Sequence, residues 1–95
     1  MSVLQIEHEV FDLLSWKKAF ESDPRGRKKM GVTQYEIFCL AGNSNNIIVN
    51  FWFEDFSQAE NQILLLNGLW DRDGGKLMKN PRVRILDMMD WNFLG

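Results

Sequence analysis

The chain has 95 residues, with 11 Lys and Arg against 13 Asp and Glu, so its formal net charge is -2. This length predicts one domain over residues 1–95, and the slightly acidic balance argues against non-specific nucleic-acid binding and against a polybasic membrane anchor. One cysteine, Cys39, excludes an intrachain disulfide framework and a multi-cysteine zinc site. No apolar run approaches the roughly 20 residues of a membrane span, and the first residues lack the pattern of a signal peptide. A reducing cytoplasm is therefore the expected location.

The first half of the chain predicts a strand, a helix and a hairpin. Apolar and polar residues alternate over 4–10, which indicates a strand with His8 on its apolar side. A helix is expected over 12–22, because Asp12 is a good N-cap and Pro24 stops helical continuation. A second strand is expected over 32–41. A turn is expected over the Gly- and Asn-rich residues 42–46.

The second half repeats the strand, helix and strand pattern. Residues 47–54 are apolar on both faces, which is typical of a strand covered on both sides. Ser57-Gln58-Ala59-Glu60 has the pattern of a capping box, so a second helix is expected to begin there and to continue at helical spacing to Trp70. A polar stretch over 71–81 leads to a last strand over 82–89, and Trp91 and Phe93 form an aromatic tail.

This order of elements predicts an α+β, ferredoxin-like βαββαβ domain: one antiparallel sheet with both helices on one face. The other face would be bare, although the third strand is apolar on both sides. Twelve aromatic residues in so short a chain also exceed what one thin core can hide. We therefore expect a homodimer through the sheet face, forming a dimeric α+β barrel, or a partner that covers that face.

Two stretches resemble a known superfamily: His8-x-Val10-x-Asp12-x-x-x-Trp16-x-x-x-Phe20, and Phe53-Glu54-Asp55-x-x-x-Ala59. They are similar to small dimeric α+β-barrel proteins of the antibiotic-biosynthesis-monooxygenase-like superfamily, in its hypothetical or cyclase-like branch. The resemblance implies two ferredoxin-like sheets packed face to face about a twofold axis, with pockets between sheet and helices. Members include cofactor-free oxygenases, haem-degrading enzymes, isomerases and stress-response proteins, so the fold does not select one chemistry.

His8 is the one histidine and the candidate catalytic residue. It would serve as a proton shuttle or ligand anchor, or, in the interpretation that we favour, as a core histidine hydrogen-bonded by Asp12, Tyr35 or Asp87. A lone histidine without patterned carboxylates predicts no metal site. No cofactor is predicted. Haem is not expected, because no trio of Asn, Trp and His matches that of the haem-degrading relatives.

The candidate ligand pocket combines large aromatic side chains with two polar ones: Trp16, Tyr35, Asn50, Trp52, Trp70 and Asp87. The aromatic residues would line the pocket or form core. Asn50 interrupts an apolar strand and needs hydrogen bonds from a ligand, a water or the twofold partner. Asp87 would be a general base of raised pKa or an exposed carboxylate at the strand end.

Three functions follow from these features. The leading hypothesis is a protein that binds or transforms a small apolar or aromatic molecule, by cofactor-independent oxygenase or isomerase/cyclase-like chemistry if it is an enzyme. The alternative is a non-catalytic structural or regulatory dimer. Residues 49–56 also resemble the third-strand motif of RNA-recognition domains, in which aromatic residues stack on bases. Val49 replaces the basic residue of that motif, Trp52 replaces a small one, and nucleic acid is not an expected partner.

Overall fold

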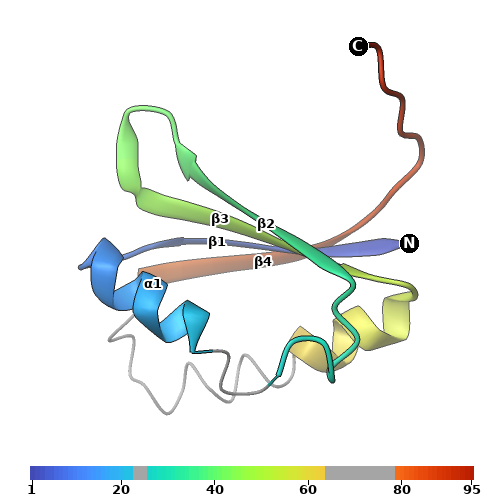
Figure 1. Cartoon of the computed structure of the whole chain (residues 1–95), viewed down its shortest axis with the longest axis horizontal. Helices are drawn as coiled ribbons and strands as arrows, with labels where there is room; N and C mark the ends of the chain where they lie inside the picture. The colour runs from blue at the N-terminus through green and yellow to red at the C-terminus, as the bar shows by residue number, and fades with distance from the viewer. Residues whose placement is uncertain (23–25, 64–78) are drawn as a thin grey trace.

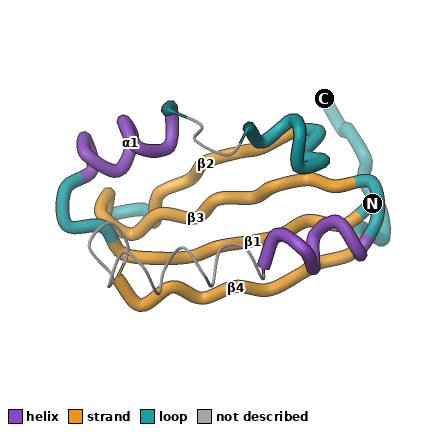
Figure 2. Tube along the Cα trace, turned by 90° about the horizontal axis from the view of Figure 1, so that it is seen from below, coloured by secondary structure: helices purple, strands orange, loops and turns teal. Residues whose placement is uncertain are grey.

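The computed structural model describes residues 1–22, 26–63 and 79–95. Its centre is a four-stranded antiparallel sheet in the order β2-β3-β1-β4, built from β1 (Ser2–Glu9), β2 (Gln34–Leu40), β3 (Asn43–Phe53) and β4 (Lys79–Asp87). Helix α1 (Leu13–Glu21) and a helical segment at 56–63 lie on the same side of this sheet (Figures 1 and 2). The α+β, ferredoxin-like fold expected from the order of elements is confirmed.

Helix α1 begins where its cap predicts. The Asp12 carboxylate accepts hydrogen bonds from the Leu14 backbone N–H at 3.1 Å and from the Ser15 hydroxyl at 2.7 Å. These bonds satisfy groups that a helix N-terminus leaves unpaired, and they hold the pKa of Asp12 below its usual value. Trp16 is the buried residue of this helix, and it anchors α1 to the sheet.

The β2–β3 turn is tighter than expected. The prediction of a turn over 42–46 is wrong, because β3 already begins at Asn43, and Leu40 pairs with Asn43 across Ala41 and Gly42. Gly42 has a φ of 86°, a conformation that glycine adopts without steric cost, so two residues suffice for the reversal. The asparagines that suggested a loop instead extend β3 beyond the sheet core (Figure 1).

The second helical segment is capped by Asp55 rather than by Ser57. The Asp55 carboxylate accepts from the Gln58 backbone N–H at 3.0 Å and from the Ser57 hydroxyl at 2.7 Å. The helix therefore starts at residue 56, before the predicted capping box, because a carboxylate two residues upstream takes the N-cap position. Trp70, where the predicted helix ends, lies outside the described residues.

Strand β4 spans Lys79–Asp87 instead of the predicted 82–89. Pro81 lies inside it, whereas the sequence predicts this residue in the preceding loop. A proline is accepted there because β4 is an edge strand, where one side of the backbone needs no ladder hydrogen bond. The chain leaves the sheet after Asp87, and the tail over residues 88–95 projects to the side away from the helices (Figure 1).

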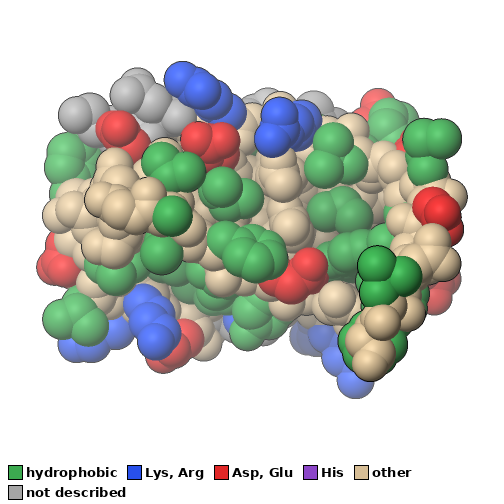
Figure 3. All heavy atoms as spheres, turned by 90° about the horizontal axis from the view of Figure 1, so that it is seen from above, with side chains coloured by type: hydrophobic (Ala, Val, Ile, Leu, Met, Phe, Trp, Pro, Cys, Tyr) green, Lys and Arg blue, Asp and Glu red, His purple; other side chains and the backbone are tan. Residues whose placement is uncertain are grey.

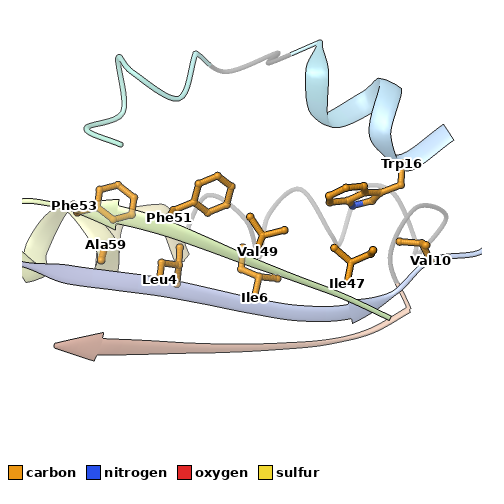
Figure 4. Close-up of a cluster of buried hydrophobic side chains, with 9 residues drawn as sticks. All are labelled: Leu4, Ile6, Val10, Trp16, Ile47, Val49, Phe51, Phe53 and Ala59. Carbon is orange, nitrogen blue, oxygen red and sulfur yellow. The ribbon is translucent and has the colours of Figure 1, made fainter. Parts of the chain in front are cut away.

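The core lies between the sheet and the helices. Every second residue of β1 and β3 points into it, with Leu4 and Phe53 fully buried. Ala59 of the second helical segment covers one end of this layer and Trp16 covers the other (Figure 4). The opposite side of the sheet, called here the open face, carries Val3, Gln5 and Glu7 of β1 together with their cross-strand neighbours. No element in the described part of the chain covers it (Figure 1).

Candidate functional site

His8 lies on the helix side of β1, opposite Ile47, and its side chain is only 2% exposed. Its ring centroid is 5.5 Å from that of Trp16, and its buried Nδ1 atom has no hydrogen-bond partner among the residues that the structure describes. Burial lowers the pKa of His8, and an interaction with the Glu9 backbone opposes this shift. The imidazole is therefore neutral near pH 7. None of Asp12, Tyr35 and Asp87 forms the expected hydrogen bond with Nδ1 of His8.

A small hollow of about 190 Å³ lies beside His8 at one end of the sheet. It is lined by Glu7, His8, Glu9, Asn46 and Arg82. Its volume suits a few waters or a very small molecule rather than an aromatic substrate. Within the described residues, no three His, Cys, Asp or Glu side chains converge as metal ligands.

The aromatic residues predicted for the pocket on the helix side form a packed cluster. Trp16 stacks on Phe20 at 5.3 Å between ring centroids, and Phe20 contacts Tyr35 at 5.2 Å and Phe51 at 6.0 Å. The Arg27 guanidinium lies 4.1 Å from the Phe20 ring centroid and donates to the Phe20 carbonyl oxygen at 2.7 Å. This cluster joins α1 and the following loop to the β2 edge. Trp16 is thus a core residue.

Tyr35 also borders a wider hollow of about 720 Å³ between the loop at 26–33 and the second helical segment. Arg27, Lys28, Glu54 and Gln58 line it too, so cationic and anionic side chains face the same space. Within residues 1–22, 26–63 and 79–95, the buried Gln58 Oε1 atom has no hydrogen-bond partner. The hollow opens widely to solvent and does not include His8.

Asn50 and Trp52 lie on the opposite side of the sheet from His8. Asn50 pairs with Gln5 of β1 and Glu36 of β2, and Gln5 pairs with Arg84 of β4. We call these four residues, Glu36, Asn50, Gln5 and Arg84, the polar row. Gln5 Nε2 donates to Asn50 Oδ1 at 3.0 Å, and Arg84 Nε donates to Gln5 Oε1 at 2.6 Å. The hydrogen bond that Asn50 requires therefore comes from the same chain.

The indole of Trp52 is fixed at the acidic end of the polar row. Its Nε1–H donates to Glu36 Oε2, and the Gln34 side-chain amide donates to the same oxygen at 3.3 Å. Hydrophobic side chains are spread over this face among polar ones, and most charged side chains lie toward its rim (Figure 3). The open face is thus less uniformly apolar than the sequence of β3 alone suggests.

A groove of about 430 Å³ lies at the end of the open face where β4 leaves the sheet. Apolar side chains and the chain leading into the tail form it: Val3, Asn50, Trp52, Leu86, Asp87, Met88, Met89 and Asp90. Asp87 also accepts a hydrogen bond from the Ser2 hydroxyl at 2.8 Å. The groove brings together Asn50, Trp52 and Asp87, whereas Trp16, Tyr35 and His8 lie across the sheet from it.

The residues that sequence reasoning missed are Gln5, Glu36 and Arg84. Each faces away from the core at an alternating position of its strand, and that alternation was visible in the sequence. Their alignment in one row depends on strand register, which alternation alone does not specify. Cys39 is exposed on the edge strand β2.

Comparison with known proteins supports the fold and goes no further. No protein-family model matches the chain, and no curated protein matches it. Among solved structures it is similar to a dimeric ferredoxin-like protein from an uncultured marine organism, with a TM-score of 0.59 and 9% identity over 90% of each chain. At that identity the similarity shows the fold alone. The resemblance to the monooxygenase-like superfamily stays a prediction.

The location of the protein in the cell also stays a prediction. In the described part of the chain, no helix has both the length and the apolar character needed to cross a membrane.

Proposed function

We propose that this protein acts as a homodimer in which the open faces of two sheets pack together. The observation that carries the proposal is the open face itself, which no described element covers although it exposes large side chains. Phe38 is 52% and Leu86 42% exposed, at opposite edges of the sheet. Packing two such faces would bury these side chains in the way that β-sandwich sheets do. The similar ferredoxin-like protein is itself dimeric, which agrees with this proposal.

The apolar side chains of the open face provide the first test. Phe38 and Leu86 would both be replaced by lysine, and the molar mass would be measured by sedimentation at micromolar concentration. We expect a dimer for the unchanged protein and a monomer for the variant. The matched control replaces Leu13 and Leu14, which are exposed on α1 on the other side of the molecule, by lysine. A monomeric unchanged protein at these concentrations would overturn the proposal.

We further propose that the groove on the open face holds a small apolar or aromatic molecule. Trp52 and the two methionines supply polarisable apolar surface, while Asn50 supplies a polar side chain that would orient a ligand. In the dimer, the partner sheet would help to exclude water from this groove. The neutral imidazole of His8 lies across the sheet, so the groove supports binding more directly than it supports acid–base catalysis by His8.

Ligand binding would be tested by thermal shift with quinone-like, fatty and polyketide-like compounds. We expect at least one class to raise the melting temperature of the unchanged protein and not that of Trp52→Ala. Phe56→Ala changes an exposed aromatic side chain on the second helical segment, on the other side of the sheet from the groove, and serves as the control. If no class of compound raises the melting temperature of the unchanged protein, the result would favour a purely structural or regulatory dimer.

Base stacking on RNA is not part of the proposal. Of the aromatic residues in the RNA-recognition resemblance, Phe51 and Phe53 point toward the helices and are buried, and Phe56 lies on the second helical segment instead of the sheet. A sheet that binds single-stranded RNA needs such rings on its exposed face.

A further inference from the structure

The polar row carries opposite charges at its two ends. Glu36 lies on the edge strand β2 and Arg84 on the opposite edge strand β4, with Asn50 and Gln5 between them. Three strand spacings separate the two charged residues, about 14 Å between their backbones. Both side chains are anchored, Glu36 by Trp52 and Arg84 by Gln5. In the described part of the chain, neither charge forms an ion pair.

We propose that the twofold axis of the homodimer runs parallel to the strands, so that Glu36 of each copy pairs with Arg84 of the other. This inference rests on the proposed dimer and specifies its geometry. A twofold axis parallel to the strands and lying between the sheets places β2 of one copy over β4 of its partner. Each cross-strand row of one copy then faces the same row of the partner, with the order of the strands reversed. The acidic end of one polar row meets the basic end of the other, twice in every dimer.

The distances and the free hydrogen-bonding groups suit this pairing. Packed sheets lie about 10 Å apart, a gap that a glutamate and an arginine together span. Arg84 uses its Nε in the bond to Gln5, so its two terminal nitrogens are available for a carboxylate. Glu36 Oε2 accepts from Trp52 and Gln34, so its other oxygen is available to the partner.

The neighbouring rows are compatible with the same axis. In the row that contains Phe38 and Arg82, the ring of one copy would meet the guanidinium of the other, a favourable cation–π arrangement. In the row that contains Trp52 and Val3, two apolar side chains would meet. An axis perpendicular to the strands would instead place Glu36 against Glu36 and Arg84 against Arg84, and these like charges would repel.

Charge reversal distinguishes the two orientations. With the axis parallel to the strands, Glu36→Arg and Arg84→Glu each create two like-charge contacts and should weaken the dimer about 100-fold. The double variant, and an equimolar mixture of the two single variants, should regain a dissociation constant close to that of the unchanged protein. Circular dichroism would confirm that each variant is folded. The defect of the single variants should shrink in about 1 M salt, where the screening length is near 3 Å.

Cross-linking provides a readout that does not depend on charge. In a chain carrying Cys39→Ser, Glu36→Cys and Arg84→Cys would be introduced singly and together, and each protein treated with a bis-maleimide about 10 Å long. We expect efficient covalent dimers from the double variant and not from either single variant. Covalent dimers from each single variant, or single charge reversals that leave an existing dimer unaffected, would overturn the proposed orientation. A monomeric unchanged protein would instead contradict the proposed dimer itself.

Discussion

Gln5 and Asn50 join β1 to β3 across the open face through one side-chain hydrogen bond, Nε2 to Oδ1, of 3.0 Å. The bond places a polar pair in the middle of a sheet whose other face is the hydrophobic core. It also links to Arg84, which donates to the second polar atom of Gln5 at 2.6 Å. Asn50 is therefore retained in the otherwise apolar part of β3 over residues 47–53 by a partner within its own chain.

Removal of either amide should destabilise the protein in a coupled way. We expect Asn50→Ala and Gln5→Ala each to lower the free energy of unfolding by about 1 kcal/mol, because each leaves a half-buried amide with one partner fewer. The double variant should lose less than the sum of the two. Urea denaturation at one fixed protein concentration would measure the three losses. Strict additivity would contradict a direct interaction between the two side chains.

His8 should make the stability depend on pH below about 6.5. Burial lowers its pKa in the folded state, whereas the unfolded chain has the ordinary value near 6.5. As the pH falls below 6.5, the unfolded state takes up the proton first, so the free energy of unfolding decreases, by at most about 1.4 kcal/mol per pH unit. Above 6.5 both states are neutral and this contribution to the pH dependence vanishes.

The matched variant for this prediction is His8→Gln, which is neutral at every pH in this window. Its stability should be nearly constant between pH 6.5 and pH 5, while that of the unchanged protein falls. Asp12 and Asp55 also have lowered pKa values, so they reduce the stability only in more acidic solution, below their ordinary value near 3.8. An identical pH profile for both proteins would show that His8 is not buried in its neutral form.

Much of the fold could be predicted because each element carries a local signal. Asp12 and the spacing to Trp16 locate α1, and the alternation over β1 assigns His8 to the core side. The errors lie at boundaries, where one residue changes the outcome. Gly42 permits a two-residue turn, and Asp55 takes the cap position from Ser57. Both boundaries depend on the local backbone geometry, and sequences of similar composition can place a turn or an N-cap one or two residues away.

The candidate site was harder to predict because it depends on non-local pairing. The residues proposed for one pocket include Trp16 and Trp52, which lie on opposite sides of the sheet. Alternation within β3 separates Trp52 from Phe51, but it does not indicate which face the helices cover. Prediction of the polar row would require the register of all three strand pairs, because its end residues, Glu36 and Arg84, lie 48 positions apart in the sequence.

Two glycines with positive φ should differ in their tolerance of substitution. Gly42 has a φ of 86°, and a Cβ atom added there would meet no atom within 4 Å; at Gly31, with a φ of 94°, an added Cβ would lie 2.9 Å from Gln58 Nε2. Gly42→Ala should cost only the backbone term, roughly 1 kcal/mol, and Gly42→Asn less. Gly31→Ala should cost more, because Gln58 must also move. Thermal denaturation that ranks Gly42→Ala as the more destabilising would contradict this explanation.

The tail over residues 88–95 should contribute to the dimer and not to the fold of the single chain. Met89 and Leu94 are 98% and 97% exposed, and the tail leaves the sheet on the side of the open face (Figure 1). Its first residues also form one wall of the groove. A chain that ends at Asp87 retains β4, so its circular dichroism should be unchanged. Its dimer should dissociate at least about tenfold more readily, since burial of one large apolar side chain contributes about 1.5–3 kcal/mol.

The apolar side chains of the tail should account for this loss. Replacement of Trp91 and Phe93 by serine in the full-length chain should weaken the dimer nearly as much as the truncation does, whereas Asn92→Ser should leave it unchanged. Sedimentation across a concentration series would give the three dissociation constants. If the truncated chain dimerised as tightly as the full-length one, the tail would be a solvent-exposed extension, and the groove would have to be completed by the partner sheet alone.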